Sequence, residues 1–352
     1  MIRVLCDAIH ADLWESLRLL FEERLGWELY RPIGMEWAEK GIWRFEQHQP
    51  YGAGVAHQFL DTWPTDVDDD GFLVRRDTTH PGQSIRLVTY EDARDQRWDL
   101  VLATLAENEQ GWWQFAQEVG AHYGIQVGNQ GAANLWPLAE FGLLSVTTPG
   151  LKPWKPHVYY RQEFDTGLFF PDGGRLAVAD HVMNRVQCTS QTPDHDRWRR
   201  MAAAVPARWR WYGHCEPRDE WFGGDHATTP EVAASMHTAR IAWHPKRWSD
   251  GYGHVIHNWF SIGRPVIGSA GYYADKLAGP LFEEGVTSFD MDRLSDDELA
   301  ATVRMLLGDE DRWLRMCEAS AERFRAVVDF DAEAAEIRAM LENVMSDRLV
   351  RG

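Results

Sequence analysis

The segment Asp250–Asn258 carries the residue types in this chain that are best suited to bind a charged ligand. It reads Asp-Gly-Tyr-Gly-His-Val-Ile-His-Asn, so two glycines precede a stretch that predicts an amphipathic helix over residues 254–262. The apolar run Ile241–Trp243 predicts a strand before this turn, and Pro265–Ile267 predicts a strand after the helix. The first N–H groups of a helix have no partner within the helix and lie at its positive end. The segment therefore predicts a phosphate or diphosphate site at one edge of a parallel sheet.

His254 and His257 share one face of the predicted helix, and two histidines at this spacing can ligate a metal ion. No cysteine or carboxylate stands near enough in the sequence to complete such a site convincingly. We therefore expect no metal site. His254 either packs within the fold or reaches a phosphate or hydroxyl of a ligand.

Strands and helices alternate along both halves of the chain, which is typical of doubly wound parallel sheets. The first half predicts strands at residues 2–6, 27–30, 85–88, 98–103, 125–127, 143–146 and 157–160. The second half predicts strands at residues 182–189, 208–212, 240–244 and 265–267. Predicted helices cover residues 13–25, 110–123, 193–204, 254–262, 295–307, 310–327 and 331–346. Residues 34–84, rich in Gly, Pro, Trp and Asp, predict long loops or an insertion over the sheet edge.

The fold class that follows is α/β, with two doubly wound domains. Residues 164–180 include Pro171-Asp-Gly-Gly174 and are the best candidate for a linker. We expect a first domain over residues 1–170, a second over residues 171–330, and a final helix over residues 331–352 that packs back on the first domain. Two such halves imply a cleft between them, and ligands of such sheets bind outside the carboxyl ends of the strands.

The composition narrows the class of protein. A formal charge of −18 argues against a surface that coats nucleic acid broadly, although it does not exclude a local basic groove. The basic aromatic stretch at residues 197–211 predicts a helix surface and a half-buried strand, with a path for a polynucleotide as the alternative. The four cysteines are far apart, which favours reduced thiols in a cytoplasmic protein. No apolar run approaches about 18 residues, and the start shows no cleavable signal pattern, so no membrane span is expected.

The run from Ala242 to Ile267 resembles the carboxyl-terminal domain of GT-B glycosyltransferases, and more closely the retaining group that includes glycogen synthase and sucrose synthase. That group carries a Glu, a Gly-aromatic-Gly turn, a helix that ends in a second Glu, and then Gly-x-Pro-Val-Ile. Asp250 matches the first acid and residues 251–253 match the turn. Asn258 stands where the second acid would be, and residues 263–267 match the closing segment. The resemblance implies a GT-B fold, in which two Rossmann-like domains face a central cleft.

The resemblance places the donor site in the carboxyl-terminal half. The donor-binding residues that it implies are Lys246, Arg247, Gly251, Tyr252, Gly253, His254 and Asn258. The backbone of the turn and the start of the helix would hold the diphosphate, and the two cations would neutralise it as it leaves. Asp250 would hydrogen-bond the hydroxyls of the donor sugar, while Asn258 would face the ribose. The nucleotide diphosphate sugar is then a co-substrate, and no metal or other cofactor is required.

The resemblance places the acceptor site in the amino-terminal half, in the loops that follow its strands. If the reaction inverts the sugar, His10 or Asp12 is the candidate general base that takes the proton of the acceptor hydroxyl. The alternative is that Asp12 starts a helix and His10 is a solvated loop residue. Further acceptor contacts are expected from Asp7, Glu107 and Asn129, which also follow predicted strands.

These residues and the resemblance together favour a glycosyltransferase that uses a UDP-sugar, with retention favoured over inversion. The sequence from Trp14 to Pro32 also resembles glycosyltransferases encoded by tailed bacteriophages. That resemblance suggests a hydroxymethylated pyrimidine in phage DNA as the acceptor, with the enzyme in the host cytoplasm. A polysaccharide or other glycan is the alternative acceptor. A non-catalytic nucleotide-sugar or DNA-binding protein of the same fold is a further alternative, motivated by Asn258 in place of a Glu.

Overall fold

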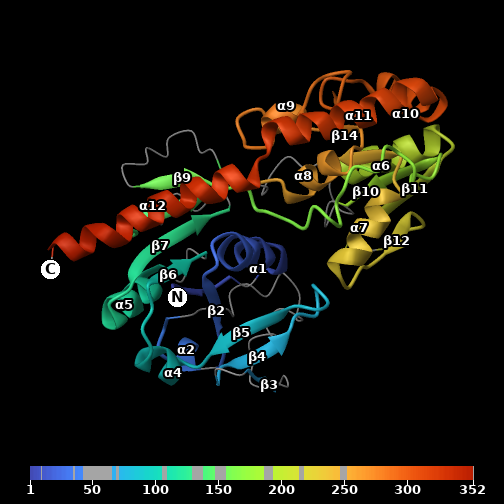
Figure 1. The fold of residues 1–352 in the computed structure, drawn as a ribbon. Helices are drawn as coiled ribbons and strands as arrows, with labels where there is room; N and C mark the ends of the chain where they lie inside the picture. Colours follow the sequence, from blue (N-terminus) through green and yellow to red (C-terminus); the bar gives the residue numbers. More distant parts are fainter. Residues whose placement is uncertain are drawn as a thin grey trace. The chain divides into compact units, whose positions relative to one another are not determined.

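The computed structural model describes residues 1–8, 10–34, 36–42, 66–68, 71–104, 109–128, 138–146, 156–185, 193–213, 218–245 and 252–351 (Figure 1). The chain forms two compact units. Unit 1 comprises Met1–Phe164 together with Phe330–Gly352, and unit 2 comprises Asp165–Asp329. Within the described residues, each unit contains one sheet whose core strands are parallel, with helices between the strands. The predicted α/β class is therefore confirmed.

In the described part of unit 1 the strands follow the order β3-β4-β5-β2-β1-β6-β7-β8-β9. Their bounds are β1 (Arg3–Cys6), β2 (Glu28–Pro32), β3 (Asp66–Val67), β4 (Leu73–Arg76), β5 (Ser84–Val88), β6 (Leu100–Ala103), β7 (His122–Val127), β8 (Phe141–Leu144) and β9 (His157–Tyr159). Neighbouring strands from β5 to β9 are parallel, whereas β4 is antiparallel to both β3 and β5. The helices are α1 (Ala11–Arg18), the π-helix η1 (Leu19–Arg24), α2 (Glu36–Glu39), α4 (Tyr90–Asp95), α5 (Glu109–Val119) and α12 (Phe330–Arg351).

Apolar helices cover both faces of this sheet. β6 is buried along its whole length, as expected for a parallel strand that is covered on both faces. On one face, α2 and α5 contribute Trp37 and Trp112, whose rings stack with centroids 5.6 Å apart. On the other face, Phe21 of η1 shares a core with Ile337 and Leu341 of α12. Helix α12 lies along β9, so the last helix belongs to the core of unit 1 (Figure 1).

In the described part of unit 2 the parallel strands follow the order β12-β11-β10-β13-β14-β15. Their bounds are β10 (His181–Asn184), β11 (Arg208–Tyr212), β12 (Phe222–Gly224), β13 (Ile241–His244), β14 (Val266–Gly268) and β15 (Ser288–Asp290). The helices are α6 (Pro193–Ala204), α7 (Thr229–His237), α8 (His254–Ser261), α9 (Ala270–Tyr273), the 3-10 helix η5 (Gly279–Leu281), α10 (Asp296–Gly308) and α11 (Glu310–Val327). Strand order runs outward in opposite directions from β10 and β13, so the winding of the chain reverses between these two strands.

The basic aromatic stretch of unit 2 forms helix α6 and the half-buried strand β11, as predicted. The rings of Trp198, Trp209 and Trp243 pack edge to face, and all three side chains are buried. The neighbouring cations Arg197 and Arg200 both bond Asp296, at 3.0 and 2.7 Å. These arginines are therefore committed to an ion-pair network on the surface of the unit.

Two predictions about local structure are wrong. Residues 34–84 do not lack regular structure throughout, because α2 lies within them and β4 pairs antiparallel with β5. The glycines and aspartates around Leu73–Arg76 obscured a strand of four residues. The helix predicted to end at residue 123 ends at Val119, because Gly120 adopts a φ of 72°. Residues after this turn begin β7 instead.

Candidate functional site

The carboxyl ends of β10, β13 and β14 form one edge of the sheet in unit 2, where the winding of the chain reverses. The strand register places Asn184, His244 and Gly268 at this edge. Arg185 and Ser269 directly follow two of these strand ends. Open α/β sheets bind their ligands at such a reversal, outside the carboxyl ends of the strands. This edge is therefore the expected position of a ligand site.

The turn that enters α8 at this edge requires glycine. Gly253 has a φ of 82° and a ψ of 49°, and a Cβ atom there would lie 3.0 Å from the ring of Tyr273. A side chain would be disfavoured by both the backbone conformation and the crowding. Glycine supplies no side-chain cap to α8. This geometry suits an anion.

The aromatic rings of Tyr252 and His257 pack together at this turn. His257 Nδ1 lies 2.9 Å from the carbonyl oxygen of Gly253, so this nitrogen carries the ring proton and donates it. The Tyr252 ring stacks on the His257 imidazole, with centroids 4.3 Å apart and planes 15° apart. Tyr252 is only 3% exposed. Its side chain therefore fixes the shape of the turn, and a contact from Tyr252 to a ligand would come from its backbone.

Asn258 Oδ1 and Ser269 Oγ are among the buried polar atoms of unit 2 that have no hydrogen-bond partner within the described part of the chain. Asn258 Oδ1, on α8, belongs to a residue that is 4% exposed, and Ser269 Oγ, after β14, to a residue that is fully buried. A buried polar atom without a partner costs about 1–3 kcal/mol of stability. Satisfaction by a bound ligand is one explanation for such a group. Asn258 was predicted from the sequence, whereas Ser269 was not.

Arg185 is a second residue at this edge that sequence reasoning missed. Its Nη1 donates to Nδ1 of His226, the second residue after β12, at 2.7 Å. The Tyr212 ring lies against both partners, 4.9 Å from the imidazole and 5.9 Å from the guanidinium carbon. The strand predicted over residues 182–189 included Arg185, whereas β10 ends at Asn184 and leaves this cation at the carboxyl edge of the sheet.

In unit 1 the predicted acceptor residues lie where β1 ends and α1 begins. Asp7 is fully buried, and its Oδ1 accepts hydrogen bonds from the backbone and the hydroxyl of Thr104, at 2.6 and 2.9 Å. Because Thr104 follows β6, this carboxylate ties two neighbouring strand ends together. His10 occupies the exposed N-cap position of α1, and Asp12 lies partly buried in its first turn. The structure thus brings Asp7, His10 and Asp12 to one end of the sheet.

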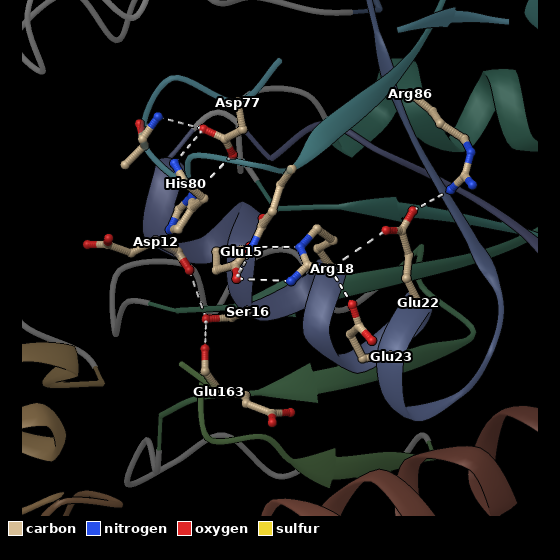
Figure 2. A network of polar contacts seen from close by, with 12 residues as sticks. Asp12, Glu15, Ser16, Arg18, Glu22, Glu23, Asp77, His80, Arg86 and Glu163 are labelled. Carbon is tan, nitrogen blue, oxygen red and sulfur yellow. Dashed lines mark hydrogen bonds and ion pairs between the residues drawn. The ribbon is translucent and has the colours of Figure 1, made fainter. Parts of the chain in front are cut away.

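A network of charged side chains lies beside α1 (Figure 2). Glu15 accepts two hydrogen bonds from Arg18, at 2.8 and 3.1 Å, and Asp77 Oδ2 lies 3.1 Å from His80 Nδ1. Figure 2 shows the His80 ring between Asp77 and the first turns of α1. Burial lowers the pKa of His80, but the hydrogen bond to Asp77 and the charges of Glu15 and Asp12 outweigh burial and raise it above its usual value. These groups favour a protonated imidazole at this position.

Several predicted site residues lie outside the described residues. They are Glu107, Asn129, Lys246, Arg247, Asp250 and Gly251. Within the described ranges, no group of three His, Cys, Asp or Glu side chains could hold a metal ion. Over the same part of the chain, no helix is both long and apolar enough to cross a membrane.

Comparison with known proteins identifies the fold. No family model and no curated protein matches the chain. Sucrose-phosphate synthase from Thermosynechococcus elongatus superposes with a TM-score of 0.65 and 12% identity, over 99% of this chain and 100% of that one. HepE from Anabaena, in its complex with UDP-glucose, superposes with a TM-score of 0.63 and 12% identity, over 97% and 100%. Its complex with UDP gives a TM-score of 0.62 at 11% identity, over the same shares of the two chains. These neighbours are GT-B glycosyltransferases, and the chain has the same α/β fold along its full length, as predicted.

Proposed function

We propose that the protein is a glycosyltransferase that moves a sugar from a nucleotide diphosphate sugar, with a UDP-sugar favoured, to an acceptor hydroxyl. The observation that carries the proposal is the carboxyl edge of unit 2. There the left-handed Gly253 brings the chain into the N-terminus of α8 without a side-chain cap of its own, and Arg185 supplies a cation. A helix N-terminus and a guanidinium are both suited to a diphosphate. Support also comes from HepE, whose solved complexes contain UDP and UDP-glucose.

The proposed donor site stabilises the leaving group. Negative charge accumulates on the diphosphate as its bond to the sugar breaks, and preorganised donors and cations lower that barrier. The N-terminus of α8 and Arg185 would share this role with Lys246 and Arg247. Asp250 would hydrogen-bond the sugar, and a ribose hydroxyl would donate to Asn258 Oδ1, which has no partner among the described residues. In this scheme the charge of the diphosphate is balanced without the need for a metal ion.

The proposed acceptor site lies at the carboxyl edge of unit 1. His10 or Asp12 would take the proton of the acceptor hydroxyl if the reaction inverts the sugar. Asp7 would organise this edge through Thr104, with Glu107 and Asn129 as further contacts. Retention of configuration remains the proposed outcome, because the segment around Asn258 resembles the retaining group.

Two acceptor classes follow from the sequence, a hydroxymethylated pyrimidine in phage DNA and a glycan. The DNA acceptor and the phage origin rest on the amino-terminal resemblance alone. The formal charge of −18 and the engagement of Arg197 and Arg200 by Asp296 count against a broad DNA-binding surface. A local groove would have to supply the cations instead.

A donor panel tests the proposal directly. The protein is incubated with UDP-, GDP- and ADP-linked sugars, with and without acceptor, and release of the nucleoside diphosphate is measured. Release that depends on an acceptor supports sugar transfer, whereas the absence of binding to every donor rejects the proposal. Binding without turnover, unrelieved by Asn258→Glu, would favour the non-catalytic binding protein.

A pair of glycine variants locates the site. Gly253→Ala should abolish donor binding, because it strains the turn that enters α8. Gly285→Ala is the matched control, since Gly285 also has a positive φ, of 72°, but a Cβ there meets nothing within 4 Å. Equal donor affinity of the two variants would place the donor elsewhere.

Mass spectrometry decides between the acceptor classes. Hydroxymethylated DNA and a panel of oligosaccharides are incubated separately with the protein and with the donor that binds. A mass gain of one sugar on the DNA supports the DNA acceptor. A gain on an oligosaccharide alone rejects the DNA acceptor and leaves sugar transfer in place.

A further inference from the structure

Arg185 occupies a central position at the carboxyl edge of unit 2. It directly follows β10, which lies between β11 and β13 in the sheet. Its guanidinium carries five N–H donors and no acceptor, whereas a diphosphate at neutral pH offers only acceptors. In the proposed function this side chain contacts the donor diphosphate. A group that holds the Arg185 side chain in position should therefore raise the affinity for the donor.

His226 holds Arg185 from two strands away. The contact joins Arg185 Nη1 to His226 Nδ1 over 2.7 Å. Because a guanidinium can only donate, Nδ1 must be the unprotonated ring nitrogen, and the single ring proton lies on Nε2. This hydrogen bond therefore requires the neutral imidazole.

Tyr212 restricts the movement of both partners. Its ring lies at 35° to the His226 imidazole, with centroids 4.9 Å apart, and the Arg185 guanidinium lies over its face. The close approach of the backbone at Gly223 confines the phenol in turn, since a Cβ atom there would lie 2.4 Å from the ring. The imidazole is thus held in the orientation that presents Nδ1 to Arg185.

The other charges around His226 are largely engaged elsewhere. Asp225 pairs with Arg218 at 2.8 Å, and Glu231 accepts hydrogen bonds from the backbone at the start of its own helix. Burial, followed by the charge of Arg185, lowers the pKa of His226, and the two carboxylates only partly offset this. His226 is therefore neutral at neutral pH and able to accept from Arg185.

We propose that His226 is a positioning residue that holds Arg185 toward the donor diphosphate and releases it when the imidazole takes up a proton. The inference rests on the proposed function. A protonated ring offers Arg185 no acceptor and repels it, so His226 no longer holds the guanidinium in this orientation. Donor affinity should fall as the pH falls through the pKa of His226. The charge of a nucleotide sugar stays constant over this range, because a diphosphate diester is a strong acid at both oxygens.

Calorimetric titration of the full-length protein tests this inference. UDP-glucose, GDP-mannose and ADP-glucose are titrated at about pH 7.5, and the donor that binds most tightly is titrated again at about pH 5.5. The Kd of the wild-type protein should rise at the lower pH, and by about tenfold once His226 is fully protonated, as expected for the loss of an ordered, charge-assisted contact. His226→Gln retains an acceptor oxygen that does not titrate, so its Kd should change little with pH. His226→Phe has no acceptor and should bind weakly at both pH values.

A matched control and a folding measurement complete the test. His157→Gln makes the same substitution at a partly buried histidine of unit 1, and this variant should keep the pH dependence of the wild type. Thermal unfolding reports whether each variant is folded. If His226→Phe is not folded, the pH dependence of His226→Gln alone tests the inference. Equal affinities of the wild type and both His226 variants at both pH values would overturn the inference and leave donor binding intact. Failure of the wild type to bind any donor would overturn the proposed function as well.

Discussion

The two units bury their charged groups in different ways. In unit 1, the charges along α1 have more than one partner each. Arg18 bonds Glu15 through two nitrogens and also bonds Glu23 at 2.8 Å, while Glu22 accepts from Arg86 at 2.6 Å. Loss of one partner leaves the remaining charges of such a network with other partners, so the network is redundant.

In unit 2, one fully buried ion pair lies away from the proposed site. Arg264 bonds both oxygens of Asp172, at 2.8 and 2.7 Å, and His237 also contacts this carboxylate. Arg264 precedes β14 and thus lies at the amino edge of the sheet. At the opposite edge, Asn258 Oδ1 and Ser269 Oγ have no partner among the described residues. In unit 2 the fully buried ion pair and the proposed ligand site thus lie at opposite edges of the sheet.

Loss of the buried pair in unit 2 should give the largest effect. Asp172→Ala would leave the Arg264 guanidinium buried without its counter-ion, because the two side chains are 1% and 0% exposed. We expect a loss of about 3–5 kcal/mol in the free energy of unfolding, measured by urea denaturation. Asp331→Ala is the matched control in unit 1, where the carboxylate pairs with Arg24 but is 83% exposed. That variant should lose less than about 1 kcal/mol. Similar losses in the two variants would remove the contrast between the units.

One buried histidine in each unit should change the pH dependence of the unfolding free energy, and the two changes should have opposite signs. Burial, followed by the charge of Arg208, lowers the pKa of His181 from its ordinary 6.5 to about 4. The unfolded chain then takes up a proton at this residue before the folded chain does, so stability falls as the pH drops from 6.5 to about 4. The loss from this residue is at most about 3 kcal/mol. His181→Gln should flatten the dependence of unfolding free energy on pH over this window.

His80 of unit 1 should show the reverse sign. Its folded pKa is raised, so the stability that protonation confers is fully present below the pKa of the unfolded chain and is lost as the pH rises through the folded value. His80→Gln should therefore make the loss of stability on acidification steeper than in the wild type. Urea denaturation of both variants at a series of pH values measures this difference. A change of the same sign in His80→Gln and His181→Gln would contradict the comparison.

The regular elements of both units could be predicted because their signals are local. Ser295 and Glu298 form the predicted capping box, in which each side chain bonds the backbone of the other, and they open α10. α11 spans Glu310–Val327, as its amphipathic pattern predicted. β4 was missed because a strand of four residues has too little alternation to stand out among turn-forming residues.

The candidate site could be predicted only in part, for the same reason. The positive φ of Gly253 follows from a glycine between a strand and a helix, which is a local pattern. The contact of Arg185 with His226 joins residues 41 positions apart, and that of Asp172 with Arg264 joins residues 92 apart. Such contacts depend on strand order, which a single sequence does not specify. Ser269 was missed because a serine after a strand is also a common helix start.

Replacement of a buried serine by alanine should have the smallest effect on stability, and it should affect the two units differently. In unit 1, Ser145 Oγ donates to the Tyr160 carbonyl at 2.7 Å and accepts from Gln126 at 3.0 Å. Ser145→Ala should cost about 1–2 kcal/mol of unfolding free energy, since two buried partners lose their hydrogen bond, and should leave donor affinity unchanged.

Ser269→Ala removes a buried hydroxyl that has no partner within the described residues, so the stability of this variant should be unchanged or slightly higher. Its donor Kd should instead rise about fivefold, as expected for the loss of one hydrogen bond to a ligand. Urea denaturation and calorimetric titration of the two variants measure both quantities. A stability loss in Ser269→Ala that matched Ser145→Ala would mean that the hydroxyl at the carboxyl edge of unit 2 is satisfied within the protein, and that this edge is not held open for a ligand.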